Sequence, residues 1–180
     1  QRVIQTLARL LPGGSIVVAD AGTPTPFTAA YLRSAAGRWV IIPRGYGGLG
    51  YAIPGVLGAK LARPQATVVG LMGDGSFGMS AGELETVARM GLPVTIIQFN
   101  NACFGWIKVS QELFQGGRCF GVDFSADTDH AGIAHGFGLR HAAWPHPALW
   151  AGGFRQAPLS AFPRALDAGS AGHRVCRHGA

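Results

Sequence analysis

Asp74 and Asn101 are the residues whose types and positions indicate chemistry most directly. Asp74 lies in Gly73-Asp74-Gly75-Ser76, directly after an apolar run, and Asn101 follows another apolar run 27 residues further along (101 minus 74). Mg²⁺ takes about six oxygen ligands in a near-octahedral arrangement. Asp74 can give a carboxylate oxygen and Asn101 an amide oxygen, and a main-chain carbonyl at Cys103 can give a third ligand. Two diphosphate oxygens and a water would complete the set.

The glycines beside Asp74 have a role that matches such a site. Gly73 and Gly75 allow the backbone to approach phosphate oxygens and to adopt positive φ. The amides of Gly75 and Ser76, with the Ser76 hydroxyl, would donate to a diphosphate, and the helix that follows adds the positive end of its dipole. Either motif alone has an ordinary interpretation, since Gly-Asp-Gly is a common tight turn and Asn-Asn is common in loops. Their combination, each after a strand, favours the functional interpretation.

The elements that must position these residues alternate between apolar runs and helical patterns, which is typical of β-α-β units. The expected strands are 16–19, 39–42, 67–72 and 94–99, and the expected helices are 3–11, 25–36, 52–61, 80–91, 104–114 and a short one ending at 137. We therefore predict an α/β fold with an open, mainly parallel sheet and helices on both faces. Both motifs then emerge at the carboxyl edge of the sheet, from neighbouring strands joined by a single crossover. Open α/β sheets bind their ligands at that edge.

Capping residues set the expected helix boundaries. Thr25 is read as an N-cap with Pro26 at the first helical position. The run from Ser80 to Glu83 fits a capping box. Asp127 or Thr128 could cap the last short helix, with Gly138 beyond its end.

Composition excludes several classes of protein. The 180 residues suit one domain, or one domain with a tail, and 48% hydrophobic content is enough for a core. Only 13% of residues are charged, which indicates that part of the surface is covered by further polypeptide or by other subunits. This favours a homo-dimer or tetramer. The net charge of +6 is scattered, with no basic helix face, so no nucleic-acid partner is expected. No apolar run reaches the roughly 18 residues of a membrane helix, so no membrane partner is expected.

Cysteine usage and the two chain ends give further expectations. The three cysteines are odd in number and form no CxxC, which favours a reducing, cytoplasmic location. The chain lacks a starting Met, so a fragment is expected. Residues 140–180 are rich in Ala, Gly, Pro, His and Arg and form an atypical, poorly specified tail, with one candidate helix at 158–166. A shifted reading frame, a degenerate gene end or divergence would explain this tail. The six histidines predict no second metal site.

The segment from Gly73 to Asn101 resembles the thiamine diphosphate signature, in which GDG is followed at a similar distance by NN. The resemblance extends to 44–54 and 111–114. Residues 1–139 are thus similar to the C-terminal, diphosphate-binding domain of the acetolactate synthase and 2-keto acid decarboxylase superfamily. The resemblance implies thiamine diphosphate and Mg²⁺ as cofactors, a 2-keto acid as substrate, and room for FAD in a parent enzyme.

The resemblance also assigns roles to individual residues. It implies that Mg²⁺ is bound by Asp74, Asn101 and the Cys103 carbonyl, and that the diphosphate is held by Gly73, Gly75, Ser76 and Thr23. The Gly47 carbonyl would accept a hydrogen bond from the 4′-amino group of the cofactor, and Leu49 would lie beneath it and force its bent shape. That shape makes proton removal intramolecular. Without the motif, Leu49 would be read as an ordinary core leucine.

The sequence also departs from this family. The family's activating glutamate lies on an N-terminal, pyrimidine-binding domain, usually of a neighbouring subunit, and that domain is absent here. We therefore expect no catalytic residue in this chain and no activity without a partner. Ile107 stands where pyruvate-decarboxylase-like members place a glutamate, which favours a synthase-like or benzoylformate-decarboxylase-like lyase. Ser110 and Pro24-Thr25 replace residues usual in acetolactate synthases. The alternatives are a partner-dependent cofactor-binding subunit or remnant, and an α/β domain whose motifs are ordinary turns.

Overall fold

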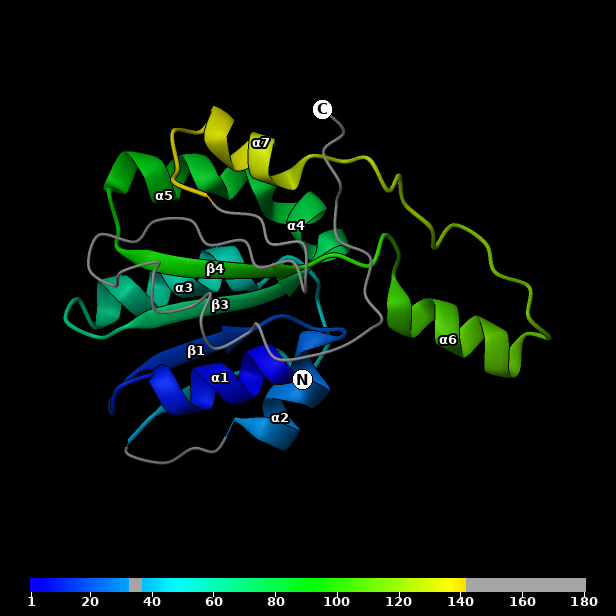
Figure 1. Cartoon of the computed structure of the whole chain (residues 1–180), viewed down its shortest axis with the longest axis horizontal. Helices are drawn as coiled ribbons and strands as arrows, with labels where there is room; N and C mark the ends of the chain where they lie inside the picture. Colours follow the sequence, from blue (N-terminus) through cyan, green and yellow to red (C-terminus); the bar gives the residue numbers. More distant parts are fainter. Residues whose placement is uncertain (33–36, 142–180) are drawn as a thin grey trace.

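The computed structural model describes residues 1–32 and 37–141 and shows a parallel sheet with helices on both faces (Figure 1). The strands are β1 (Ile16–Ala19), β2 (Trp39–Ile41), β3 (Val68–Gly73) and β4 (Val94–Phe99). The helices are α1 (Arg2–Leu10), α2 (Pro24–Tyr31), α3 (Ala52–Ala62), α4 (Asp74–Ser80), the 3₁₀ turn η1 (Ala81–Glu83), α5 (Leu84–Met90), α6 (Gly105–Phe114) and α7 (His130–Gly136). The predicted fold class is confirmed.

The register of the sheet decides which loops meet. The strand order is β2-β1-β3-β4, and every pair is parallel. β3 and β4 pair from Val68 opposite Val94 to Gly73 opposite Phe99. The residues that follow the two strands, Asp74 and Asn100, therefore leave the sheet at the same level. The prediction that the two motifs emerge from neighbouring strands is confirmed.

The core consists of two clusters, one on each face of the sheet. Residues of α3, α4, α5 and α7 pack on one face, and residues of α1 pack on the other. β1, β3 and β4 are buried on both faces, which is why they read as continuous apolar runs. Gly55 allows α3 to approach the sheet, because a Cβ there would lie 2.8 Å from Cγ1 of Val18.

The predicted helix boundaries need three corrections. α2 begins at Pro24 with Thr23 as N-cap, two residues before the predicted Thr25 cap, and it ends at Tyr31. The capping box at Ser80 is wrong, because Ser80 makes no capping bond and its hydroxyl donates to the carbonyl of Ser76 instead. The helical region already begins at Asp74, directly after β3. The last correction concerns the helix ending near residue 137.

α7 is capped by Asp129 rather than by Asp127 or Thr128. The Asp129 carboxylate accepts a hydrogen bond from the amide of Gly132 at 2.8 Å. Gly138 lies beyond the helix end with φ +75, as predicted. The candidate helix at 158–166 and all of the predicted tail except Arg140 and His141 lie outside the described residues.

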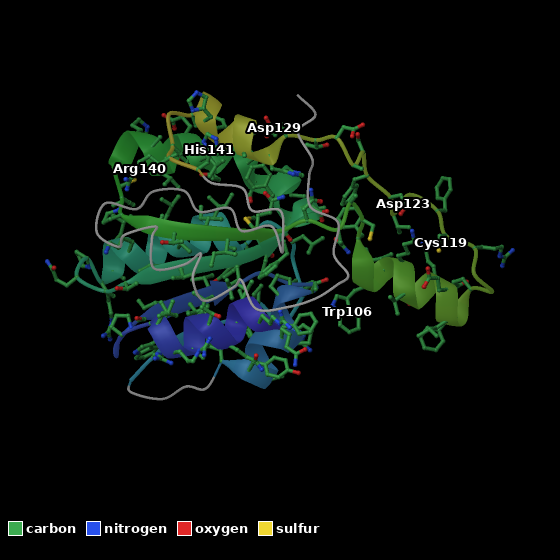
Figure 2. The ribbon with its side chains drawn as sticks, viewed as in Figure 1. Trp106, Cys119, Asp123, Asp129, Arg140 and His141 are labelled. Carbon is green, nitrogen blue, oxygen red and sulfur yellow. The ribbon has the colours of Figure 1, made fainter. Side chains whose placement is uncertain are left out.

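α6 stands away from the sheet (Figure 1). None of its residues is buried, and its apolar side chains are exposed. Figure 2 shows Trp106, Cys119 and Asp123 around this helix, at a distance from the layered part of the molecule. Among the described residues, no helix is both long and apolar enough to cross a membrane.

Candidate functional site

The carboxyl ends of the parallel strands bring together the loops that contain the predicted site residues. Thr23 follows β1, Gly47 and Leu49 follow β2, Asp74 follows β3, and Asn101 follows β4. This edge of the sheet is where open α/β folds bind ligands.

Asp74 joins the two predicted motifs directly. It is buried, at 5% exposed. Its Oδ2 accepts hydrogen bonds from the amides of Asn101 at 3.0 Å and Ala102 at 2.6 Å, and its Oδ1 accepts from the amide of Gly75 at 2.9 Å. The Gly-Asp-Gly and Asn-Asn motifs therefore form one structural unit, although they are far apart along the chain.

The loop after β4 has a turn that exposes one face of Asn101. Ala102 adopts a left-handed conformation with φ 54, and its amide also donates to Oδ1 of Asn100 at 3.0 Å. Such side-chain to backbone bonds are typical of Asn in turns. Asn101 is exposed, and its Nδ2 lies 3.1 Å from Sγ of Cys103. The side-chain oxygen of Asn101 is therefore the atom left to act as a ligand.

Cys103 pairs with Asp123 in an isolated antiparallel bridge. The flanking hydrogen bonds run from the Phe104 amide to the Val122 carbonyl and from the Phe124 amide to the Ala102 carbonyl, both at 2.8 Å. Burial, and after it the Asp74 carboxylate, raises the pKa of the Cys103 thiol. The thiol is therefore protonated at neutral pH, and its carbonyl, rather than its sulfur, suits a hard cation.

The glycines of the first motif have two different environments. A Cβ at Gly75 would lie 2.4 Å from Cε1 of Phe104 and 3.1 Å from Cζ of Phe124, so aromatic packing requires glycine there. A Cβ at Gly73 would have no atom within 4 Å, which leaves space for a ligand to approach its backbone. Neither glycine is among the residues with positive φ, so the left-handed conformation that glycine permits is not adopted at either position. Both belong to ordinary extended or helical backbone.

Thr23 reaches the same place as Asn101. A Cβ at Gly105, the first residue of α6, would lie 2.9 Å from Nδ2 of Asn101 and 3.6 Å from Oγ1 of Thr23. These two side chains come from the loops after β1 and β4, which are not adjacent strands. The structure thus brings Thr23, Asn101 and, through its bond to the Asn101 amide, Asp74 to one end of the sheet.

The loop after β2 is the least enclosed part of the site. Gly47 is exposed with φ 65, and no atom lies within 4 Å of its Cβ position. Leu49 is half-buried, and its Cδ2 lies 3.9 Å from the Cβ position of Gly22. Leu49 therefore lies beside the loop that carries Thr23, whereas Gly47 is further out in solvent.

Sequence reasoning missed Asp20, a fully buried carboxylate directly after β1. Its Oδ1 accepts from the amide of Ala21 at 2.9 Å and its Oδ2 accepts from the amide of Ala52 at 3.1 Å. The Ser76 hydroxyl also donates to it. Burial raises the pKa of Asp20, and these hydrogen bonds oppose the shift. An aspartate directly after a buried strand is the same signal that singled out Asp74.

His130 was considered in the sequence only as a metal ligand. Its ring meets Phe77 edge to face, with centroids 5.2 Å apart, and it lies within electrostatic reach of Asp74. Burial lowers the pKa of His130, while Asp74 and Asp129 oppose the shift. Within residues 1–32 and 37–141, no group of three or more His, Cys, Asp or Glu could hold a metal ion. A cation site here must therefore use amide and carbonyl oxygens beside Asp74.

Comparisons with known proteins agree with this geometry. Residues 20–160 match the family model described as thiamine pyrophosphate enzyme, C-terminal TPP binding domain. The chain is 40% identical over 118 residues to an acetolactate synthase large subunit of Buchnera aphidicola subsp. Schizaphis graminum, which covers 66% of this chain and 21% of the relative. It is 34% identical over 137 residues to a sulfoacetaldehyde acetyltransferase of Rhodobacter capsulatus, covering 76% and 23%.

A solved structure shows the same relationship. The thiamine diphosphate-dependent 4-hydroxybenzoylformate decarboxylase of Rhodococcus jostii RHA1 superposes with a TM-score of 0.72 at 27% identity, covering 79% of this chain and 27% of the other. The chain therefore spans only about a fifth to a quarter of the proteins it matches. The match to the family model over most of its length, together with the four loops that meet at the sheet edge, shows that this chain belongs to the thiamine pyrophosphate enzymes, as their C-terminal TPP-binding domain.

Proposed function

We propose that this domain binds thiamine diphosphate through Mg²⁺ and serves as the C-terminal part of a 2-keto acid carboligase or decarboxylase of acetolactate synthase-like type. The observation that carries the proposal is that the Asp74 carboxylate accepts hydrogen bonds from the amides of Asn101 and Ala102 at the carboxyl edge of the sheet. This contact supports the proposal, because it joins the loop that carries Asp74 to the loop that carries Asn101.

The donor set fits a magnesium ion. An ionised carboxylate has about four lone-pair positions, and Oδ1 of Asp74 accepts a hydrogen bond from the Gly75 amide, while Oδ2 accepts from the amides of Asn101 and Ala102. Oδ1 therefore keeps a position for a cation. The side-chain oxygen of Asn101 and the carbonyl of Cys103 would add two neutral oxygens. Such a set leaves positive charge on the metal to attract a diphosphate.

The remaining site residues fit the cofactor. The open space at Gly73 and the hydroxyl of Thr23 beside Asn101 suit a diphosphate. Leu49, beside Gly22, would support the bent cofactor, and the Gly47 carbonyl would face its amino group. When bound, the cofactor supplies the electron sink for decarboxylation of a 2-keto acid, and the protein supplies position and electrostatics.

Decarboxylation without carboligation is the second candidate function. Ile107, 47% exposed near the start of α6, stands where a pyruvate-decarboxylase-like enzyme would have a glutamate. The solved relative is itself a 4-hydroxybenzoylformate decarboxylase. A synthase joins the decarboxylated 2-keto acid to a second carbonyl compound, whereas a lyase of that type releases it as an aldehyde, so a product assay of the whole enzyme separates them.

The exposed apolar face of α6 is the basis for proposing a partner domain. Its apolar side chains are exposed by 43–76%, and they are Trp106, Ile107, Val109, Leu113 and Phe114. Large exposed apolar patches mark interaction sites. Because the relatives are several times longer than this chain, we propose that a pyrimidine-binding domain, of the same or a neighbouring subunit, covers α6 and supplies the activating glutamate. The isolated chain should then give no turnover.

Calorimetric titration of thiamine diphosphate, with and without Mg²⁺, tests the proposed function. Binding should require Mg²⁺ and should disappear in Asp74→Ala, because the variant loses the only charged ligand. Asp127→Ala is the matched control, since Asp127 is an exposed aspartate in the segment between α6 and α7. Full binding by Asp74→Ala, with the melting temperatures of both variants unchanged, would contradict the proposal.

A further inference from the structure

A second carboxylate, Asp20, lies beneath the same loops and takes no part in the proposed metal site. It is 0% exposed and follows β1 directly, with its amide donating to the Leu71 carbonyl at 2.7 Å. Burying a carboxylate is costly unless hydrogen bonds replace its water. The position of Asp20 therefore needs a physical reason beyond hydrophobic packing.

The donors to Asp20 come from three separate segments. The Ala21 amide belongs to the loop after β1, the Tyr51 and Ala52 amides lie at the start of α3, and the Ser76 hydroxyl lies in the first turn of α4. These donors are all neutral. One carboxylate thus connects segments that are 32 residues apart, between Asp20 and Ala52, and still further apart between Asp20 and Ser76.

Each connected segment also carries a residue of the proposed cofactor site. Thr23 is two residues beyond Ala21, Leu49 is three residues before Ala52, and Asp74 is two residues before Ser76. A shift of any of these segments would move its site residue relative to the others. Binding sites lose affinity when their residues are held loosely, because ordering them costs free energy.

We propose that Asp20 is a positioning residue, whose carboxylate holds the three segments in the arrangement that binds the magnesium-cofactor complex. The inference rests on the proposed function and extends it to a residue that touches neither ligand. It also changes the role expected of the Ser76 hydroxyl, because its one proton is donated to Asp20 and is no longer available to a diphosphate.

Asp20→Asn is the sharpest variant. Asparagine has nearly the same shape, but one of its two terminal atoms is a donor. Whichever way the amide is oriented, its NH₂ group faces the amide of Ala21 or that of Ala52, and two donors then oppose each other. Thr95→Val is the matched control, because Thr95 is a buried polar residue, 3% exposed, in the first half of β4 and away from the carboxyl edge.

Titration calorimetry with thiamine diphosphate and Mg²⁺ separates positioning from folding. A positioning role predicts a Kd raised by about tenfold or more in Asp20→Asn, with an unchanged number of sites, since a buried unpaired donor costs on the order of a tenfold change in equilibrium. A purely structural role would lower the number of competent sites and leave the Kd of the folded molecules unchanged. Wild-type Kd in Asp20→Asn, or an equal change in Thr95→Val, would overturn the proposal.

Titration of the wild-type protein and a second variant distinguish failure of the proposed cofactor binding from failure of the proposed role of Asp20. If the wild-type chain fails to bind, the proposed function fails, and Asp20 is then judged by amide hydrogen exchange alone. Ser76→Ala removes one donor and keeps the carboxylate, which also covers the case in which Asp20→Asn does not fold. Faster exchange at the amides of Tyr51 and Ala52 in Ser76→Ala is expected. Unchanged exchange there would show that Asp20 does not couple the segments.

Discussion

Replacing Gly75 with alanine separates two explanations of the glycine in the first motif. If the glycine serves only the close approach of phosphate, Gly75→Ala should weaken cofactor binding and leave stability unchanged or slightly raised. The structure gives a different reason. A Cβ at this position would lie 2.4 Å and 2.8 Å from two ring atoms of Phe104, and 3.1 Å from Cζ of Phe124.

The expected magnitude follows from two opposing effects. Alanine is favoured over glycine inside a helix by about 1 kcal/mol. Overpacking a rigid contact costs about 1–3 kcal/mol. Phe104 has little freedom to move, because its ring packs edge to face on Phe124, with centroids 4.5 Å apart, and its amide is bonded to Val122. We therefore expect Gly75→Ala to destabilise the domain by up to about 2 kcal/mol after both effects.

Gly78 provides the control within the same helix. It is exposed on α4, and a Cβ there would have no atom within 4 Å. Gly78→Ala should therefore stabilise the domain by up to about 1 kcal/mol, since only helix propensity changes. Urea unfolding followed by circular dichroism measures both free energies. A Gly75→Ala variant as stable as Gly78→Ala would refute the packing argument, and Phe104→Leu should relieve the strain if the argument is right.

Two further predictions concern α7. Asp129→Ala removes the bond to the Gly132 amide and should cost about 1 kcal/mol of unfolding free energy, whereas Asp127→Ala, which lacks that cap, should cost almost nothing in the same urea experiment. His130 has a pKa below its ordinary value of 6.5 because of burial, so the folded state binds a proton less tightly than the unfolded state. Stability should therefore be fully present above that value and fall as the pH drops below it. His130→Phe, which keeps an aromatic contact with Phe77, should flatten the dependence of the urea midpoint on pH; a slope equal to that of the wild type would assign the effect to other groups.

The strand boundaries could be predicted from the sequence to within one residue, because the apolar residues that form each strand are contiguous in the sequence. All four are short apolar runs, three of them buried, and such runs have few alternatives once glycines and prolines bound them. The adjacency of the two motifs followed from topology, since one crossover joins neighbouring parallel strands. The register pairs Gly73 with Phe99, so the two strands end at the same level of the sheet.

Helix starts were less predictable, because tertiary contacts decide them. Ser80 to Glu83 has the composition of a capping box, yet the helical region begins at Asp74, whose carboxylate is fixed by amides from a distant loop. No local pattern around Ser80 contains that information. The packing at Gly75 could not be predicted for a similar reason, since the ring that excludes a side chain belongs to Phe104, far along the chain.

Asp20 and Asp74 show a common physical solution at the ends of a parallel sheet. Backbone groups in the loops after the strands have no ladder partners, and unpaired buried amides are costly. Each aspartate follows its strand directly and accepts hydrogen bonds from backbone amides elsewhere in the chain. Asp20 accepts from the start of α3, and Asp74 accepts from the loop after β4. Asp74 accepts from the amides of Gly75, Asn101 and Ala102, whereas Asp20 accepts from the amides of Ala21, Tyr51 and Ala52 and from the Ser76 hydroxyl. The two aspartates therefore differ in the groups that surround them rather than in residue type or burial, and the Gly-Asp-Gly motif contains only one of the two carboxylates that hold these loops together.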